Sequence, residues 1–389
     1  MTSEVFYLSA RSRSEFESLS KIKAQVLLGE LGFEERVKQG DKVCIKTHFG
    51  ALANTRYLRP SYARLLVDYV KQHGGEPFVA ESCGAGMPHG EGEYAGRASE
   101  EEYLLCAKMH GFTDDTMGCP VTMIDGPLGL DWFNQALPEG KRFKEVMVAG
   151  KLKMTDVLIM HTHLKGHGSA GFGGAIKNLG IGCVPKGGKS AAHHSQRMDI
   201  KKQPCPPDCK KCIDNCPMDA LIKDESGYII RNGEKCKRCR FCHSSCPKGT
   251  FVTDSHISQE QFIEQMCDNA MGVVKAMGKE NIFYLNMVID VVPQCDCSGA
   301  SDVPIVPDIG ILASMDPVAL DQACCDLVHK SLAEPYSVAW ELGLGENTEK
   351  LAYIYGKKGS PPNNSWKMQL ESAEAIGLGS RDYELEELD

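Results

Sequence analysis

With 389 residues, the chain exceeds the roughly 250 to 300 residues at which a single core usually stops growing, so we expect more than one domain. The 42% hydrophobic content argues against disorder, and the net charge of −9 disfavours a nucleic-acid binder, which needs a basic surplus against phosphate. The sequence shows neither a signal peptide nor an apolar run of about 18 residues, so we expect a cytoplasmic protein that does not contact a membrane.

The first part of the chain alternates strands and helices, a pattern typical of an α/β fold. Strands are expected at residues 5–10, 42–49, 77–82 and 120–125, and helices at 15–31, 61–73 and 100–110. The glycine-rich piece 83–96 is predicted to be a loop. An apolar strand at 157–160 then runs directly into two histidines.

These histidines, His161 and His163, alternate at a strand end, so their side chains should share one face. Loops at the carboxyl ends of strands carry the ligands in open α/β sheets. Metal binding, substrate binding and acid–base catalysis are open for both residues, as is a structural hydrogen bond. His48 follows a strand in the same way.

Residues 161–189 contain nine glycines in 29 positions. Each glycine in a helix costs about 1 kcal/mol relative to alanine, so we predict a loop that allows tight turns or close ligand approach. Four lysines lie among these glycines: Lys165, Lys177, Lys186 and Lys189. Such a segment suits an anion or phosphate cradle, although a structural loop with solvated lysines explains it too.

Eight of the 18 cysteines fall in one segment of 42 residues that has few apolar side chains. Its second run, CKRCRFCHSSCP, fits the C-x2-C-x2-C-x3-C-P pattern of two-cluster bacterial ferredoxins, in which the fourth cysteine of each run ligates the other cluster. One [4Fe-4S] cluster would take Cys205, Cys209, Cys212 and Cys246, and the other would take Cys236, Cys239, Cys242 and Cys216.

The first run, CPPDCKKCIDNCP, departs from this pattern by one extra residue between Cys205 and Cys209. A pair of zinc knuckles is the alternative for the segment. The two Cys-Pro terminators at matched positions favour iron–sulfur clusters, because zinc sites do not require them.

After the cysteine segment the α/β pattern returns, with a helix at 256–277, a strand at 281–290 and a helix at 317–329. The acidic end, DYELEELD, is expected to fray. We therefore expect an α/β domain with an open mixed or parallel sheet, made from residues 1–200 and 251–389. A ferredoxin-like 2[4Fe-4S] domain at 201–250 interrupts it.

Cysteines outside the segment divide into two groups. Cys295 and Cys297 follow a strand in a loop of small residues, where two thiolates can reach one metal or cluster; two inert thiols are the alternative. Further ligands for a third metal site would come from Cys183, Cys44 or Cys83. Cysteines in predicted helices are explained as small buried hydrophobic residues, namely Cys106, Cys267, Cys324 and Cys325.

Several strings together resemble the DUF362 family of iron–sulfur-associated proteins, whose general function is unassigned. They are KTHFG from Lys46, NTRYLRP at 54–60, YAGR at 94–97, HLKGHGSAGFGGAIKNLGIGC at 163–183, and CDC followed by PIVPDIGILASMDPVALDQA. The spacing of His167 and Lys177 across AGFGG is also similar to the cofactor loop of nickel-pincer lactate racemases, in which the matching Lys carries the cofactor. An Asn replaces that family's Asp at position 54, so the resemblance implies candidate site residues but not the nickel cofactor.

The main hypothesis is an anaerobic-type iron–sulfur oxidoreductase with a second site in the α/β domain. The predicted catalytic residues are Lys177, His167, His163 and His161, and the predicted cofactor-binding residues are Gly171, Gly173, Gly174 and Lys177. A redox partner such as a ferredoxin, a flavodoxin or a reductase would exchange electrons, and a small molecule would be the substrate. The alternatives are an electron carrier that serves a partner enzyme, and a racemase-like isomerase.

Overall fold

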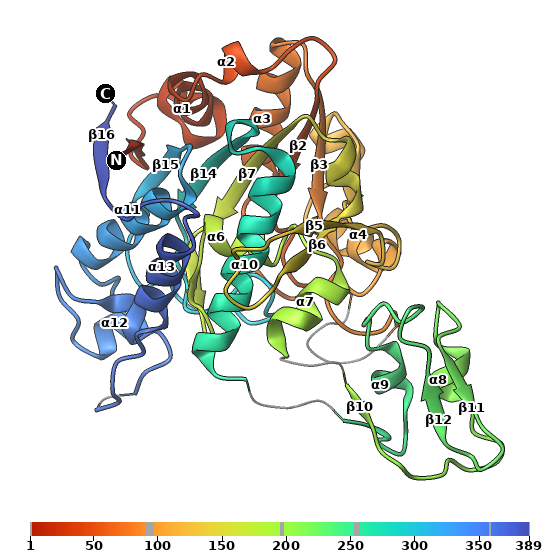
Figure 1. Cartoon of the computed structure of the whole chain (residues 1–389). Coiled ribbons are helices and arrows are strands. Elements are labelled where there is room, and N and C mark those ends of the chain that lie inside the picture. Colours follow the sequence, from red (N-terminus) through yellow and green to blue (C-terminus); the bar gives the residue numbers. More distant parts are fainter. Residues whose placement is uncertain (1, 90–95, 195–197, 253–256, 358, 389) are drawn as a thin grey trace.

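Figure 1 shows the computed structural model, which describes residues 2–89, 96–194, 198–252, 257–357 and 359–388. One sheet of eight strands has the order β16-β1-β15-β14-β7-β2-β3-β4, and only β15 runs against its neighbours. The predicted α/β fold with an open mixed sheet is confirmed. The strands are β1 (Ser3–Ser9), β2 (Lys42–Lys46), β3 (Glu76–Glu81), β4 (Val121–Met123), β7 (Val157–His163), β14 (Ile282–Val288), β15 (Gly310–Ser314) and β16 (Tyr383–Glu387).

Helices cover both faces of the sheet because the central strands are apolar on both sides. Along β7, Val157 and Ile159 belong to one core, and Leu158 and Met160 belong to the other. The first core is closed by α1 (Ala24–Glu30), α2 (Phe33–Arg36), α3 (Pro60–Gln72), α4 (Glu100–Met109) and α5 (Asp114–Met117). The second is closed by α6 (Ala175–Gly180), α7 (Lys186–His193), α10 (Gln259–Met277), α11 (Pro317–Lys330), α12 (Val338–Glu341) and α13 (Ser365–Ala375).

The secondary structure near both ends of the chain differs from that predicted from the sequence. The predicted helix at 15–31 is split into a 3-10 turn, η1 (Glu15–Glu17), a π turn, η2 (Leu19–Lys23), and α1, because Ser18 between the turns has an extended backbone. The acidic tail is not frayed: β16 pairs in parallel with β1, with Leu385 opposite Val5. Backbone hydrogen bonds hold this edge strand, although its glutamates are exposed.

The glycine segment also differs from the predicted loop. It folds into a hairpin of β8 (Lys165–His167) and β9 (Gly171–Gly173), followed by α6 and α7. These short helices are tightly packed, and Gly180 faces the backbone of α10 so closely that a side chain would not fit. Glycine is used here for close approach between elements. Of the sequence predictions, Tyr94 and Ala95 of the YAGR string and His256 lie outside the described residues.

Smaller elements complete the α/β part. They are a hairpin of β5 (Trp132–Ala136) and β6 (Glu145–Ala149), and the 3-10 turns η3 (Gly150–Met154), η4 (Lys279–Asn281) and η5 (Lys350–Ala352). Among the described helices, none has both the length and the apolar character that a membrane span needs.

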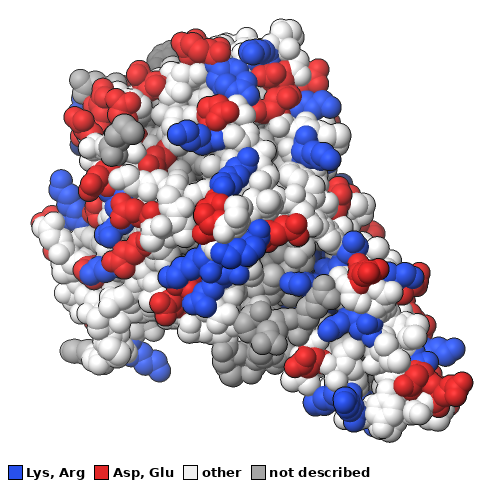
Figure 2. Space-filling view, viewed as in Figure 1, with Lys and Arg blue, Asp and Glu red and all other residues white. Residues whose placement is uncertain are grey.

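The cysteine segment forms a small module that projects from the carboxyl edge of the sheet (Figures 1 and 2). Its own core consists of Cys212, Leu221, Ile229 and Phe251. Its two ends pair with each other as β10 (Asp199–Ile200) and β13 (Phe251–Val252), so the chain enters and leaves at one place. The remaining elements are α8 (Lys211–Asp214), β11 (Leu221–Lys223), β12 (Ile229–Arg231) and α9 (Phe241–Ser245).

Candidate functional site

A cavity of about 370 Å³ lies at the carboxyl edge of the sheet, where β2, β3, β7 and β14 all end. The parallel strands bring their last residues to one edge, as the sequence analysis expected for His161 and His163. Side chains from the glycine segment and the module complete the wall. The lining includes His48, Glu81, His161, His163, Lys165, His167, Lys177, Lys186, Lys189, Cys239, Arg240, Cys295 and Cys297.

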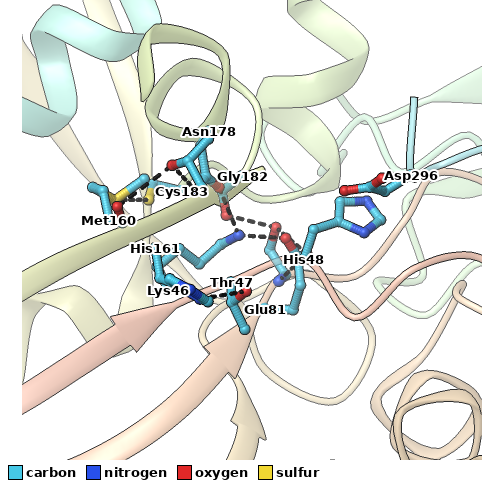
Figure 3. A network of polar contacts seen from close by, with 12 residues as sticks. Lys46, Thr47, His48, Glu81, Met160, His161, Asn178, Gly182, Cys183 and Asp296 are labelled. Atoms are coloured by element: carbon cyan, nitrogen blue, oxygen red, sulfur yellow. Dashed lines mark hydrogen bonds and ion pairs between the residues drawn. The ribbon is translucent and has the colours of Figure 1, made fainter. Parts of the chain in front are cut away.

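The floor of the cavity is a buried polar network (Figure 3). Lys46 at the end of β2 makes an ion pair with Glu81 at the end of β3, and its ammonium also donates to Asn178 Oδ1 at 3.0 Å. Burial opposes ionisation of Glu81, but Lys46 and then His48 hold its pKa below the usual value. Lys46 is fully buried, so the pair has to stay intact for either charge to be tolerated.

His161 and His163 have different environments although they share a strand. His161 Nδ1 lies 3.2 Å from Thr47 Oγ1 (Figure 3), and burial lowers its pKa to about 3, which keeps the ring neutral. His163 uses both ring nitrogens: Nδ1 lies 2.9 Å from Asp296 Oδ1 and Nε2 lies 2.9 Å from the carbonyl oxygen of Ile289. His163 therefore has no nitrogen left for a metal, and it holds Asp296 in place.

Asp296 connects the strand β7 to the Cys295–Cys297 loop. Its carboxylate also forms an ion pair with Lys165, in which Nζ lies 3.1 Å from Oδ2. Burial opposes its ionisation, but His163 and Lys165 hold its pKa well below the usual range. The carboxylate thus fixes the loop that carries the two thiols.

The thiols of Cys295 and Cys297 lie beside His167, and their ligand atoms are within 4.8 Å of one another. Among the described residues, this is the one group of three or more ligand side chains that close together. The thiol of Cys297 and then Lys177 hold the pKa of Cys295 well below its usual value, and Lys177 Nζ lies 3.7 Å from the Cys295 sulfur. The arrangement can hold a soft metal ion through one imidazole and two sulfur atoms.

The other cysteines considered as ligands lie elsewhere. Cys183 Sγ is 4.0 Å from Met160 Sδ in the core, and Cys44 is fully buried on β2. Cys83 Sγ points to the carbonyl oxygen of Gly126. The side chain whose ligand atom lies near the two thiols is instead His167, in the hairpin of the glycine segment.

The three predicted cofactor-binding glycines separate in space. Gly173 and Gly174 line the cavity, whereas Gly171 does not. At Gly171 the backbone has φ +81°, and a Cβ there would strike the backbone of Trp366, so this glycine serves packing. Gly174 leaves room for the carboxylate of Asp321, which accepts hydrogen bonds from the backbone of α6.

Two lysines of α7 line the cavity, and one of them contacts the module. Lys186 is 2% exposed and its ammonium lies 4.8 Å from the ring centroid of Phe241 in α9. Burial lowers the pKa of Lys186 to about 8. Lys189 donates to Ser82 Oγ at 2.8 Å. Two lining residues, Glu81 and Arg240, were not predicted from the sequence. Glu81 lies at the end of a predicted strand, which is the signal that identified His161, whereas Arg240 carried no such signal.

The module is suited to two iron–sulfur clusters. Burial raises the pKa of Cys212 to about 11, and the neighbouring Cys246, Cys205 and Cys209 add to the shift. Burial also raises the pKa of Cys239, with Cys216 and Cys236 as its neighbouring thiols. These neighbours fit the two crossed sets that the sequence pattern predicts, while Cys242 lies near Cys212 as well as near Cys239, Cys236 and Cys216. The fourth cysteines are held alike, since the sulfur of Cys216 accepts from Ala220 N and that of Cys246 accepts from Thr250 N, both at 3.3 Å.

The extra residue in the first run is accommodated by a single lysine. Lys223 Nζ donates to the carbonyl oxygens of Pro206 at 3.0 Å and Cys209 at 3.2 Å, and also to that of Pro207. These hydrogen bonds hold the longer loop between Cys205 and Cys209 in one conformation. With the longer loop held in this way, Cys205 remains a predicted ligand.

Fold and site together define an α/β protein that carries a ferredoxin-type cysteine module beside a basic, thiol-containing cavity. Residues 43–326 match the family described as a domain of unknown function, DUF362, and this protein belongs to the family. The resemblance found in the sequence strings is confirmed.

Short stretches of the sequence are also similar to curated proteins. The B subunit of the anaerobic dimethyl sulfoxide reductase of Haemophilus influenzae is 41% identical over 44 residues, which are 10% of this chain and 22% of that protein. The corresponding Escherichia coli subunit is 40% identical over 38 residues, 10% of this chain and 18% of that protein. An uncharacterized ferredoxin of Methanocaldococcus jannaschii is 40% identical over 47 residues, 11% of this chain and 61% of that protein. The protein thus matches about a fifth of each reductase subunit.

Two solved structures are similar at low sequence identity. The lactate racemase apoprotein from Thermoanaerobacterium thermosaccharolyticum has a TM-score of 0.40 and 13% identity, covering 99% of this chain and 82% of that one. A structural-genomics protein from Thermotoga maritima has a TM-score of 0.40 and 11% identity, covering 83% and 66%.

Proposed function

We propose that this protein is an iron–sulfur redox protein whose module, residues 201–250, exchanges single electrons with a ligand in the cavity of the α/β domain, residues 1–200 and 251–389. The observation that carries the proposal is that Cys239 and Arg240 of the module line the same cavity as Lys177 and Cys295. A [4Fe-4S] cluster supplies one-electron transfer when bound. A dedicated electron carrier needs no such cavity next to its cysteines.

The two cysteine sets have different surroundings, and this supports a path for electrons from an outside partner through the module to the cavity. The set with Cys239 faces the cavity, and Lys186 and Phe241 pack at this junction. The set with Cys205 and Cys246 lies in the rest of the module, where a one-electron protein such as a ferredoxin, a flavodoxin or a reductase would reach it. We propose this partner as the external electron source, and reduction of the cavity ligand as the reaction.

We further propose that His167, Cys295 and Cys297 hold one metal ion at the far wall of the cavity. Lys177 contacts the sulfur of Cys295, and Asp296, between the two cysteines, is held by Lys165 and His163. Two sulfur ligands and one imidazole select zinc or another soft transition ion over magnesium or calcium.

Metal analysis tests the composition of both sites. Protein purified without oxygen should contain about eight iron and eight sulfide per molecule, as two cubanes require, plus one further metal ion. The double variant Cys295→Ser with Cys297→Ser should lose only the further ion. Cys119→Ser, a control thiol that is 7% exposed and outside the cavity lining, should keep it. An unchanged metal content in the double variant would contradict the third site.

Electron exchange tests the function itself. The reduced protein is mixed without oxygen with small organic compounds, and reoxidation of the clusters is followed by their visible absorbance. A compound that acts in the cavity should reoxidise the wild type, while Lys177→Ala keeps its cluster absorbance but loses this reoxidation. If Lys177→Ala reoxidises at the same rate with every compound, the cavity does not take part and the carrier hypothesis holds.

A further inference from the structure

We propose that the ligand of the cavity is a small organic anion whose carboxylate or phosphate group binds to the lysines of its wall, with Lys186 as the central contact. The inference names the ligand class of the site and rests on the proposed function only for the ligand's redox role. Anion binding as such needs no cluster chemistry.

The charge of the lining is strongly one-sided. Six basic side chains line the cavity, and Glu81 is the one acidic side chain among the described lining residues. The six are Arg97, Lys165, Lys177, Lys186, Lys189 and Arg240. A cavity with such a lining attracts anions and repels cations.

Three buried carboxylates lie near the cavity, and two of them face lysines of its lining, Lys165 and Lys189. Glu81 pairs with Lys46, and Asp296 pairs with Lys165 at 3.1 Å. Asp125 lies 3.9 Å from Lys189 Nζ. Each of these acids is fully or almost fully buried, so it serves a local lysine and not the cavity as a whole.

Lys186 has a different environment. Its ammonium donates to the carbonyl oxygen of Gly86 at 2.9 Å and to that of Ala98, and it faces the ring of Phe241. Within the described part of the structure its ammonium forms no ion pair with a carboxylate. Burial lowers its pKa, and the nearby Cys83 and Asp125 offset that shift only in part. Carbonyl oxygens satisfy the hydrogen bonds of a buried ammonium but do not neutralise its charge, which remains costly in a low-dielectric interior. A bound anion would supply the missing negative charge.

The backbone of the wall allows a small ligand to come close. Gly84 and Gly86 border the cavity near Lys186, and Gly173 and Gly174 border it near Lys177. A Cβ at Gly173 would lie 3.2 Å from Lys165 Cε and would crowd the lysine side chains. At about 370 Å³, the volume suits a compound of metabolite size and not a polymer.

Because of the position of Lys186, its replacement should also change the reduction potential of a cluster, which a binding measurement does not report. The residue touches the cavity on one side and Phe241, between Cys239 and Cys242, on the other. Neutralising its charge should therefore lower the reduction potential of the nearby cluster, because cluster potentials follow the local net charge. The cluster of the Cys205 set should respond less.

The test uses the oxidised, cluster-loaded protein and three probes at constant ionic strength: malonate, its neutral diamide, and inorganic phosphate. Titration calorimetry should show binding of malonate or phosphate and none of the diamide, and the tighter of the two anions identifies the preferred head group. Lys186→Met should weaken anion binding roughly tenfold or more, which is the size expected when one charged contact is lost. Lys186→Arg should retain most of the affinity.

The surface variant Lys153→Met removes the same charge from an exposed position and should bind as the wild type does. Cluster absorbance confirms that each variant is folded and loaded. Equal binding of the diamide, or wild-type affinity in Lys186→Met, would overturn the proposal. Because calorimetry needs no electron transfer, a failure here leaves the electron-exchange test intact, and anion binding without electron exchange would overturn the proposed function alone.

Discussion

Cys239 of the module and Cys295 of the loop after β14 line one cavity, although they belong to different parts of the fold. The polypeptide between them leaves the module through β13, crosses α10 and passes along β14 in the centre of the sheet. A thiol of one cysteine set therefore shares a cavity wall with Cys295, whose sulfur Lys177 contacts.

Single replacements should reveal the crossed ligand sets. Cys216→Ser and Cys239→Ser should disturb the same cluster, and Cys246→Ser and Cys209→Ser should disturb the other, because in the ferredoxin pattern the fourth cysteine of each run ligates the other cluster. EPR spectra of the reduced variants check this: the two variants of one set should have similar spectra, which differ from those of the other set. A spectrum in which Cys216→Ser resembles Cys209→Ser would mean that each run binds its own cluster.

The ion pair of Lys46 and Glu81 should be costly to break. Glu81→Gln leaves the fully buried ammonium of Lys46 without its counter-ion, so we expect a loss of about 3 kcal/mol in the free energy of unfolding. Denaturant unfolding followed by tryptophan fluorescence measures it. Glu76→Gln, at the exposed start of β3, makes the same chemical change and should have almost no effect.

A second replacement tests whether the unpaired charge of Lys46 is the cause of the lost stability. Adding Lys46→Met to Glu81→Gln removes the unpaired charge and should recover part of the lost stability. If the double variant is less stable than Glu81→Gln alone, the remaining hydrogen bond of Lys46 to Asn178 is worth more than the unpaired charge costs.

Gly174→Ala should disturb the start of α6. The new methyl group would collide with the carboxylate of Asp321, which accepts hydrogen bonds from Ala175 N at 2.8 Å and Ile176 N at 3.0 Å. We expect a cost of about 1 to 3 kcal/mol, as for overpacked cores, with a lower thermal midpoint. Gly345→Ala, which has open space around it, is the control and should melt like the wild type.

Stability should fall on acidification through buried histidines. Burial lowers the pKa of His329 to about 4, with Glu349 opposing and Lys350 and Lys367 adding to the shift. Its ordinary pKa of about 6.5 returns on unfolding, so the unfolded protein binds more protons between these values and stability is lost as pH falls from about 6.5 towards 4.

A ring replacement isolates this contribution. His329→Phe keeps a ring against Trp366, whose centroid lies 4.4 Å away, but binds no proton. The thermal midpoint of this variant should change less between pH 7 and pH 5 than that of the wild type, while His89→Phe, at a side chain that is 79% exposed, should leave the slope unchanged. Equal slopes in all three proteins would mean that His329 is not the source.

The strands that carry the site were predictable because each is a short apolar run followed by a polar residue. That pattern identified His48, His161 and His163, and it applies equally to Glu81. The spacing of the eight module cysteines predicts cluster ligands, because loops of fixed length hold a cubane. Glycine counts misled at α6 and α7, because these helices use glycine for close packing.

The amino-acid sequence by itself determined the α/β class, the cysteine module and the two thiols after β14, since these depend on periodicity and spacing along the polypeptide. Only the tertiary structure decided that His167 joins Cys295 and Cys297, that His163 is taken by Asp296 and that Lys186 lies against the module. These relationships join residues far apart in the sequence, and they arise where the sheet brings the carboxyl ends of its parallel strands to a single edge.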